Sequence, residues 1–164
     1  MSDTGSVVAF WSLAIVTVGS GVMVAAVRNL LHAALFLILS FVGIAGLYIT
    51  LSADFIAVAQ VLIYAGAISV LIVFAVFLTP QAGRDNAETS LRLPALGLGA
   101  MFASIVAAVA VSTEWKDTAD GTISDTARAI GEALLDKYVL PFEIAGALLL
   151  VAMLGAIALV REED

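Results

Sequence analysis

Five long runs of apolar residues constrain this chain more than any other feature of its sequence. They cover residues 7–27, 30–51, 55–79, 93–112 and 141–160. A bilayer core is about 30 Å thick, so roughly 20 apolar residues in helical conformation cross it. With 62% hydrophobic and only 13% charged residues, the chain lacks the polar surface that a soluble core requires. We therefore predict an all-α integral membrane protein, with residues 1–164 forming a single transmembrane domain of five helices.

The connections between the runs differ in length and character. We expect the first run to be a retained helix, not a signal peptide, because no basic segment precedes it and a second span follows at once. The polar loop 113–140 is the longest connection. In it, apolar side chains at helical spacing predict a short amphipathic helix, lying on the membrane surface or against a partner. These are Ala127, Ile130, Leu134 and Tyr138, with Thr122 and Ser124 as candidate caps.

The basic residues favour an orientation with the N-terminus outside and the C-terminus in the cytoplasm. This arrangement puts four of the seven Lys and Arg residues on the cytoplasmic side, as positively charged loops prefer. The remaining three then fall in the outer loop, where they are spread among acidic residues. The cytoplasmic group is Arg28, Arg84, Arg92 and Arg161, and the outer group is Lys116, Arg128 and Lys137.

The composition excludes several kinds of chemistry from this chain. There are no cysteines, so disulfides, thiolate zinc sites and cysteine-held iron-sulfur clusters are ruled out. One histidine, His32, cannot supply a bis-histidine haem. A net charge of -7 argues against nucleic acid as a partner. We expect no catalytic, cofactor-binding or metal-binding residue in the chain.

No Lys or Arg lies near the middle of an apolar run, and the acids Asp54 and Glu143 both lie at run ends. Asp54 is typical of an aspartate that opens a helix in a tight turn, and Glu143 of a carboxylate stabilised in a first helical turn. Both are also candidate polar contacts on a proton path or at a subunit interface. His32 is typical of a histidine bonded to a neighbouring helix. No acid, histidine, Lys or Arg lies at mid-span, so we expect a complete ion pathway to need other chains.

The centre of the third run is interrupted by small and polar residues: Gln60, Tyr64, Ala65, Gly66, Ala67 and Ser69. Two interpretations are open. Gly66 lowers the cost of leaving the α-helical ladder, and Gln60 and Tyr64 share a face, so the segment suits a π-bulge at a functional site. Alternatively, Ala65 and Ser69 have the spacing of small residues that let membrane helices pack closely, which spacing alone favours.

The residues of the third run also resemble a known family. The stretch 53–71, ADFIAVAQVLIYAGAISVL, is similar to the third helix of subunit J of bacterial proton-translocating NADH:quinone oxidoreductase, respiratory complex I, the counterpart of mitochondrial subunit 6. The resemblance extends to Arg28, Asn29 and 32–34, and to 140–153 in the fifth run. It omits the fourth run and its loops. Relatives extend further at the C-terminus, so contacts of their tails are not carried over.

The resemblance implies a coupling role. In that family the third helix carries a π-bulge at the element matching Tyr64, Ala65 and Gly66, and its interconversion with α-helix is thought to gate protons during quinone reduction. We therefore expect a coupling hinge at Tyr64, Ala65, Gly66 and Ala67, with Asp54, Gln60 and Glu143 as secondary polar contacts. This reverses the weighting between the two interpretations of the third run.

The same resemblance implies the surroundings of the chain. FMN, iron-sulfur clusters, NADH and a quinone would be used by other subunits. The neighbours would be membrane-arm subunits of K, A, H and N type, in the lipid bilayer of a bacterial plasma (inner) membrane. Other possibilities are a subunit of a membrane-bound hydrogenase, a photosynthetic-type dehydrogenase complex or a multi-subunit cation/proton antiporter, or a purely structural assembly subunit.

Overall fold

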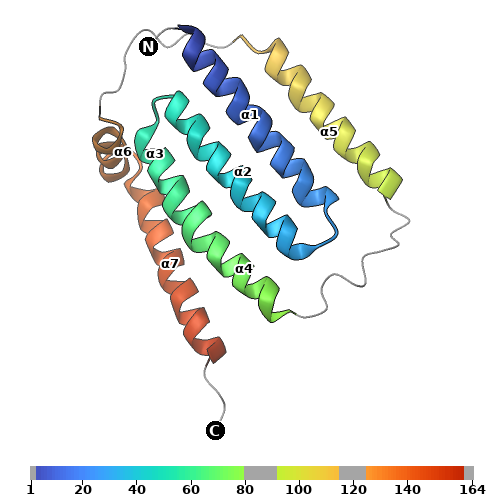
Figure 1. Ribbon diagram of the computed structural model, residues 1–164. Helices are drawn as coiled ribbons and strands as arrows, with labels where there is room; N and C mark the ends of the chain where they lie inside the picture. Colours follow the sequence, from blue (N-terminus) through green and yellow to red (C-terminus); the bar gives the residue numbers. More distant parts are fainter. Residues whose placement is uncertain (1–2, 80–91, 115–124, 161–164) are drawn as a thin grey trace.

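The chain folds into long membrane-spanning helices. The computed structural model describes residues 3–79, 92–114 and 125–160, and in these ranges all regular structure is helical. Five helices are long and apolar enough to cross a membrane, which confirms the predicted five-span fold. The elements, shown in Figure 1, are α1 (Asp3–Ala26), α2 (Leu30–Thr50), α3 (Asp54–Ala59), the π-helix η1 (Gln60–Ile68), α4 (Ser69–Leu78), α5 (Arg92–Ser112), α6 (Thr126–Leu135) and α7 (Val139–Val160).

Two tight connections make α1, α2 and the third span antiparallel neighbours (Figure 1). At the first, Asn29 caps α2, because its Oδ1 accepts hydrogen bonds from the backbone N–H groups of Leu31 at 2.9 Å and His32 at 3.3 Å. At the second, Ser52 adopts a left-handed conformation with φ 58°. The Ala53 N–H then donates to the Tyr48 carbonyl at 2.9 Å, which ends α2.

Helices α1 and α2 approach closely because small residues line their contact. A Cβ on Gly43 would overlap the Thr17 side chain, and a Cβ on Gly46 would lie 2.7 Å from Leu13 Cδ2. The hydroxyl of Ser40 donates across the interface to the Thr17 carbonyl at 3.3 Å. In lipid, where apolar surface gives helices no reason to associate, such small-residue packing and hydrogen bonding hold them together.

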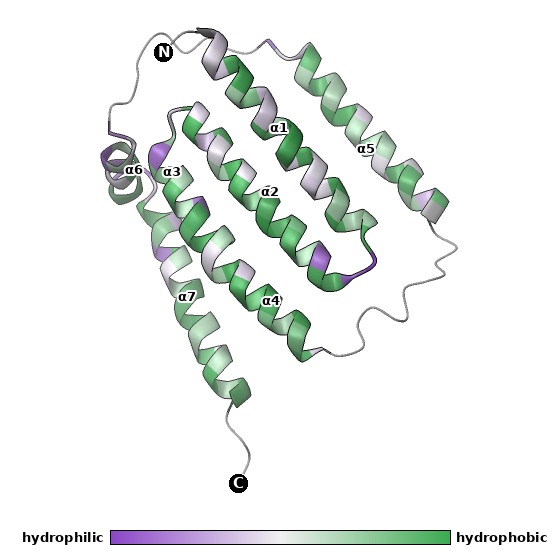
Figure 2. Ribbon diagram, in the orientation of Figure 1, coloured by the Kyte–Doolittle hydropathy of each residue, from purple (hydrophilic) through white to green (hydrophobic). Residues whose placement is uncertain are grey.

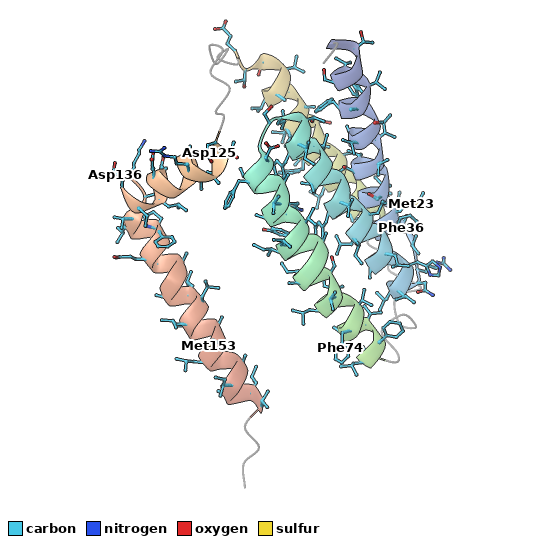
Figure 3. The ribbon with its side chains drawn as sticks, turned by 60° about the vertical axis from the view of Figure 1, so that its left-hand side comes forward. Met23, Phe36, Phe74, Asp125, Asp136 and Met153 are labelled. Atoms are coloured by element: carbon cyan, nitrogen blue, oxygen red, sulfur yellow. The ribbon has the colours of Figure 1, made fainter. Side chains whose placement is uncertain are left out.

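The predicted amphipathic helix is present as α6. Its N-cap is Asp125, whose Oδ1 accepts from the Arg128 N–H at 3.0 Å, while the predicted caps, residues 122 and 124, lie outside the described residues. The helix ends at Leu135, so Tyr138 falls in the turn before α7 and not on the predicted apolar stripe. Figure 3 shows α6, between Asp125 and Asp136, lying across the upper end of α7.

Helices α5 and α7 stand apart from the bundle. In the described part of the chain, α5 contacts no other helix, and α7 contacts only α6. Every residue of α7, and every described side chain of α5, is exposed. Figure 2 shows both helices coloured as mainly hydrophobic, and Figure 3 shows α7, marked by Met153, diverging from α4, marked by Phe74. Their apolar surfaces are therefore left to lipid or to other subunits.

Candidate functional site

The third span is a single helix whose middle leaves the α-helical pattern. It runs from Asp54 to Leu78 and contains nine π-helical residues, Gln60–Ile68, between the α-helical pieces α3 and α4. The predicted π-bulge is therefore present in the expected helix. π-Helical pieces are rare in proteins and occur frequently at functional sites. This segment is accordingly the candidate functional site.

The hydrogen bonds at the end of η1 show the change of register. The N–H of Ser69 donates to the carbonyls of Tyr64 and Gly66, and so bypasses the Ala65 carbonyl, its partner in a regular α-helix. The Ser69 hydroxyl donates to the same Tyr64 carbonyl at 2.7 Å. Two donors from Ser69 thus meet one oxygen five residues back.

Gly66 is the only glycine of the π-helical segment. A Cβ built on this residue would lie 3.2 Å from the Val61 carbonyl oxygen, also five residues back, and closer than most real Cβ contacts. Beyond the neighbouring backbone of their own helices, Gly97 in α5 and Gly146 in α7 have nothing within 4 Å of such a Cβ. The π register thus brings the carbonyl five residues back against this position, where glycine also lowers the cost of leaving the α-helical ladder.

The segment packs against α2 through Tyr64. Its ring meets the ring of Phe41 edge-on, with centroids 5.6 Å apart and planes at 68°. Tyr64 is still 45% exposed, whereas Gln60 at the start of η1 is only 8% exposed. No hydrogen bond joins these two side chains, so the bond across a shared face that the α-helical spacing allowed is not formed.

Asp54 lies at the mouth of the third span, beside an apolar groove. It is the first residue of α3 and is exposed, but the N-cap position belongs to Ala53, which makes no side-chain capping bond. Asp54 thus opens the helix after a tight turn, as the sequence indicated, but as its first residue and not as its N-cap. The groove has a volume of about 350 Å³ and is lined by Ile49, Asp54, Ala57, Val58, Val61 and Leu62.

A contact from the outer connection reaches the same end of the third span. The backbone N–H of Phe55, one of the free donors of the first helical turn, donates to Thr126 Oγ1 at 3.3 Å. Thr126 is the first residue of α6. The short helix thus supplies the polar partner that Asp54 does not.

The other predicted residues are not brought to this segment. Glu143 lies on α7, which has no contact with the third span, and its side chain is exposed. His32 is also exposed, and its ring makes no hydrogen bond with any described residue, so the expected bond to a neighbouring helix is absent. Among the described residues, no group of His, Asp or Glu side chains could hold a metal ion.

Sequence reasoning missed two features of the segment. Ser69 was singled out for close packing, which its 2% exposure supports, but not for its bond to the Tyr64 carbonyl. The spacing of five residues between Tyr64 and Ser69 is the signal that could have revealed it. No feature of the sequence indicates that Phe41 is the partner of Tyr64, because this contact depends on how two helices pair.

Comparison with known proteins agrees with this arrangement. Residues 20–159 match the family of NADH-ubiquinone/plastoquinone oxidoreductase chain 6. NAD(P)H-quinone oxidoreductase chain 6 of Leptolyngbya boryana is 39% identical, over 99% of this chain and 83% of the relative, and that of Synechocystis is 37% identical, over 95% and 81%. F(420)H(2) dehydrogenase subunit J of Methanosarcina mazei is 35% identical, over 99% and 98%.

These matches extend along the chain and include the third span with its π-helical segment. The identities lie above 30%, and the alignments cover most of both partners. A multi-pass helical fold, a π-helix in the third span and sequence similarity along the chain thus agree. The chain belongs to the NADH-ubiquinone/plastoquinone oxidoreductase chain 6 family.

Proposed function

We propose that this chain is a membrane-arm subunit of a proton-translocating NAD(P)H:quinone oxidoreductase and couples quinone reduction to proton movement through its third span. The observation that carries the proposal is the π-helical segment Gln60–Ile68 in a span that is otherwise α-helical. Coupling requires an element with two arrangements of similar energy, which a partner reaction can bias. A helix holding one extra residue in a π-bulge is such an element.

The geometry explains how a change at this segment could act on its surroundings. If the bulge reverts to α-helix, one residue is absorbed into the ladder, and one end of the span turns by about 100° and shifts by about 1.5 Å relative to the other. A different set of side chains from the third span would then face α2. Tyr64, with its ring against Phe41 and nearly half of its surface exposed, is placed to report this rotation to a neighbouring helix.

The roles we assign follow from this geometry. Tyr64, Ala65, Gly66 and Ala67 form the hinge, which includes the residues bypassed or crowded in the π register. Gln60, buried at the start of η1, lies where a water or proton path would need a polar side chain. Asp54 and Glu143 are secondary polar contacts that neighbouring subunits would complete.

The partners we propose are other membrane-arm subunits, of K, A, H and N type. They would cover α5 and α7, which are exposed in the described chain. FMN, iron-sulfur clusters, NADH and the quinone would be bound by other subunits. We place the complex in a bacterial plasma (inner) membrane, with the N-terminus outside and the C-terminus in the cytoplasm.

A different electron donor is the second candidate. The archaeal relative is named a subunit of F(420)H(2) dehydrogenase, and this chain covers 98% of its length, against 83% for the Leptolyngbya relative. Purification of the tagged chain with its complex in mild detergent would decide between the donors. Oxidation of NADH or NADPH with quinone supports the first proposal, and oxidation of reduced F420 alone supports the second.

The coupling proposal is tested at Gly66. In the assembled complex, Gly66→Ala should favour the α form, because glycine lowers the cost of leaving the α-helical ladder and alanine, with its higher α-helix propensity, does not. Gly66→Val should act more strongly. We expect fewer protons pumped per quinone reduced, measured with a pH-sensitive dye in proteoliposomes. The matched control is Gly97→Ala, where the added Cβ meets nothing. Unchanged pumping and quinone reduction in assembled Gly66→Val would refute the hinge.

A further inference from the structure

The hydroxyl of Ser69 makes an unusual bond for a helical serine. In this chain the hydroxyls of Ser20, Thr79, Ser104 and Thr113 donate to carbonyls four residues back, as serine and threonine commonly do in helices. Ser69 reaches five residues back, to the Tyr64 carbonyl, at 2.7 Å. That target is available only while the backbone follows the π register, since an α-helix brings the fourth carbonyl, not the fifth, to this position.

Because Ser69 is buried, its hydrogen bond to the Tyr64 carbonyl affects the stability of the π form. The residue is 2% exposed, so water cannot replace the hydroxyl as a donor to the Tyr64 carbonyl. A buried hydrogen bond is lost at a net cost when one partner is removed. In the α form the hydroxyl would return to the carbonyl four residues back, a bond that slightly destabilises and bends helices. The hydroxyl therefore favours the π form over the α form.

The bond also fixes a residue that faces the neighbouring helix. Its acceptor belongs to Tyr64, the ring of which packs edge-on against Phe41 of α2. Holding the Tyr64 carbonyl holds the backbone from which this ring projects. The position of the ring and the register of the helix are thus set by the same hydroxyl.

We propose that Ser69 is a positioning residue that sets the balance between the π and α forms of the third span, by binding the Tyr64 carbonyl with its hydroxyl. Ser69 touches no substrate and acts through the backbone of Tyr64. The consequence for proton pumping rests on the proposed function, whereas the effect on helix register does not.

The first experiment measures helix register in the intact complex. Cryo-EM of complexes with Ser69→Ala should show the ratio of π to α form in the third span lowered about fivefold, the effect of one lost hydrogen bond. Amide hydrogen exchange within residues 64–69 should also change, because the two registers pair these N–H groups with different carbonyls. Ser104→Ala, which removes an exposed hydroxyl bonded four residues back, is the matched control and should change neither.

A second variant separates the hydrogen bond from packing. Ser69→Cys keeps a side chain of similar size but donates only weakly, so its effect on register should lie between wild type and Ser69→Ala. If Ser69→Ala prevents assembly of the complex, Ser69→Cys provides the test of the proposal. A ratio and an exchange rate equal to wild type in assembled Ser69→Ala, or in Ser69→Cys where only that complex assembles, would overturn the proposal.

Proton pumping distinguishes this proposal from the coupling function. If Ser69→Ala shifts the register but the number of protons per electron is unchanged, Ser69 has the proposed role and the third span is not the coupling element. If Ser69→Ala leaves the register unchanged while Gly66→Val abolishes pumping, the coupling function stands and the role of Ser69 is refuted. A shift in both quantities supports both proposals.

Discussion

At the residue scale, small side chains determine how the helices of this chain meet. The buried residues of the described chain are Ser20, Ala34, Ser40, Gly43, Ala45, Ala57, Gln60 and Ser69, and only Gln60 among them is large. In water such a core would bury too little apolar area to be stable. In lipid, close contact of backbones and a few hydrogen bonds take over that role.

Gly43 provides the sharpest test of this close packing. Gly43→Ala places a Cβ against the Thr17 side chain, so α1 and α2 must separate or Thr17 must rotate. We expect the free energy of unfolding to fall by about 1–3 kcal/mol, as for other overpacked sites. Thermal unfolding of the purified complex, followed by circular dichroism, should show a lower midpoint. Gly146→Ala, with open space around its Cβ, serves as control, and equal midpoints for both variants would contradict this account.

The residues of the third span also show which contacts could be predicted from the sequence and which could not. Gly66 and its polar neighbours pointed to the third span, because glycine and buried polar groups are unusual within an apolar helix. Ser69 and Phe41 were missed as partners of Tyr64, since one bond requires the π register and the other contact requires the pairing of α2 with η1. Neither the register of a bulge nor the pairing of two apolar helices is encoded by periodicity.

At the element scale, local residues determine where each helix begins, but only some of these starts can be predicted from the sequence. Asn29 is an N-cap visible from its residue type, and Pro141 lies within the first turn of α7, where its missing N–H is tolerated. Asp54, an equally good capping residue by type, sits one position too late and caps nothing. The backbone conformation of the turn before α3 decides this, and it cannot be deduced from composition.

The cap of α6 yields a prediction at this scale. Asp125→Ala removes the acceptor for the Arg128 N–H and should destabilise the short helix by about 1 kcal/mol. Amide exchange in residues 126–135 should then be faster by about fivefold in the intact complex. The exposed Arg128–Glu132 ion pair is the comparison: Glu132→Gln should change exchange by less than twofold. A larger effect from Glu132→Gln than from Asp125→Ala would refute the prediction.

At the scale of the whole molecule, five spans were predictable because the membrane sets their length and apolar character. The assembly of those spans was not. The sequence does not say that α1, α2 and the third span form one packed group while α5 contacts no other described helix and α7 contacts only α6, since apolar residues of all five spans face the same solvent. That division becomes visible only when contacts are known.

The free helices predict where other subunits attach. The chain has no cysteines, so a single photo-reactive cysteine conjugate can be placed at will. At Leu149 on α7, which is 73% exposed, we expect cross-links to other subunits of the purified complex. At Ala45, which is 3% exposed within the packed group, we expect none. Mass spectrometry of the products checks both positions, and cross-links from Leu149 to lipid alone would show that α7 has no protein neighbour.

The orientation of the chain is a separate prediction. Arg28→Cys lies in the connection between α1 and α2, and Leu51→Cys in the turn between α2 and α3, on opposite sides of the membrane. With the N-terminus outside, a membrane-impermeant maleimide applied to intact cells should label Leu51→Cys, whereas Arg28→Cys should react only after permeabilisation. The reverse pattern would invert the proposed topology.

The separation of the helices by contact has a further consequence for biosynthesis. The elements that pack together, α1 through α4, are consecutive in the chain, so the ribosome completes this group before α5 and α7 are made. The first half can therefore acquire its native contacts as it enters the bilayer. On the proposed assembly, α5 and α7 would acquire their packing partners only when other subunits are present. A copy of the chain without its complex would leave the apolar surfaces of α5 and α7 without protein contacts. We therefore expect its lifetime in the cell to depend on the supply of the other subunits.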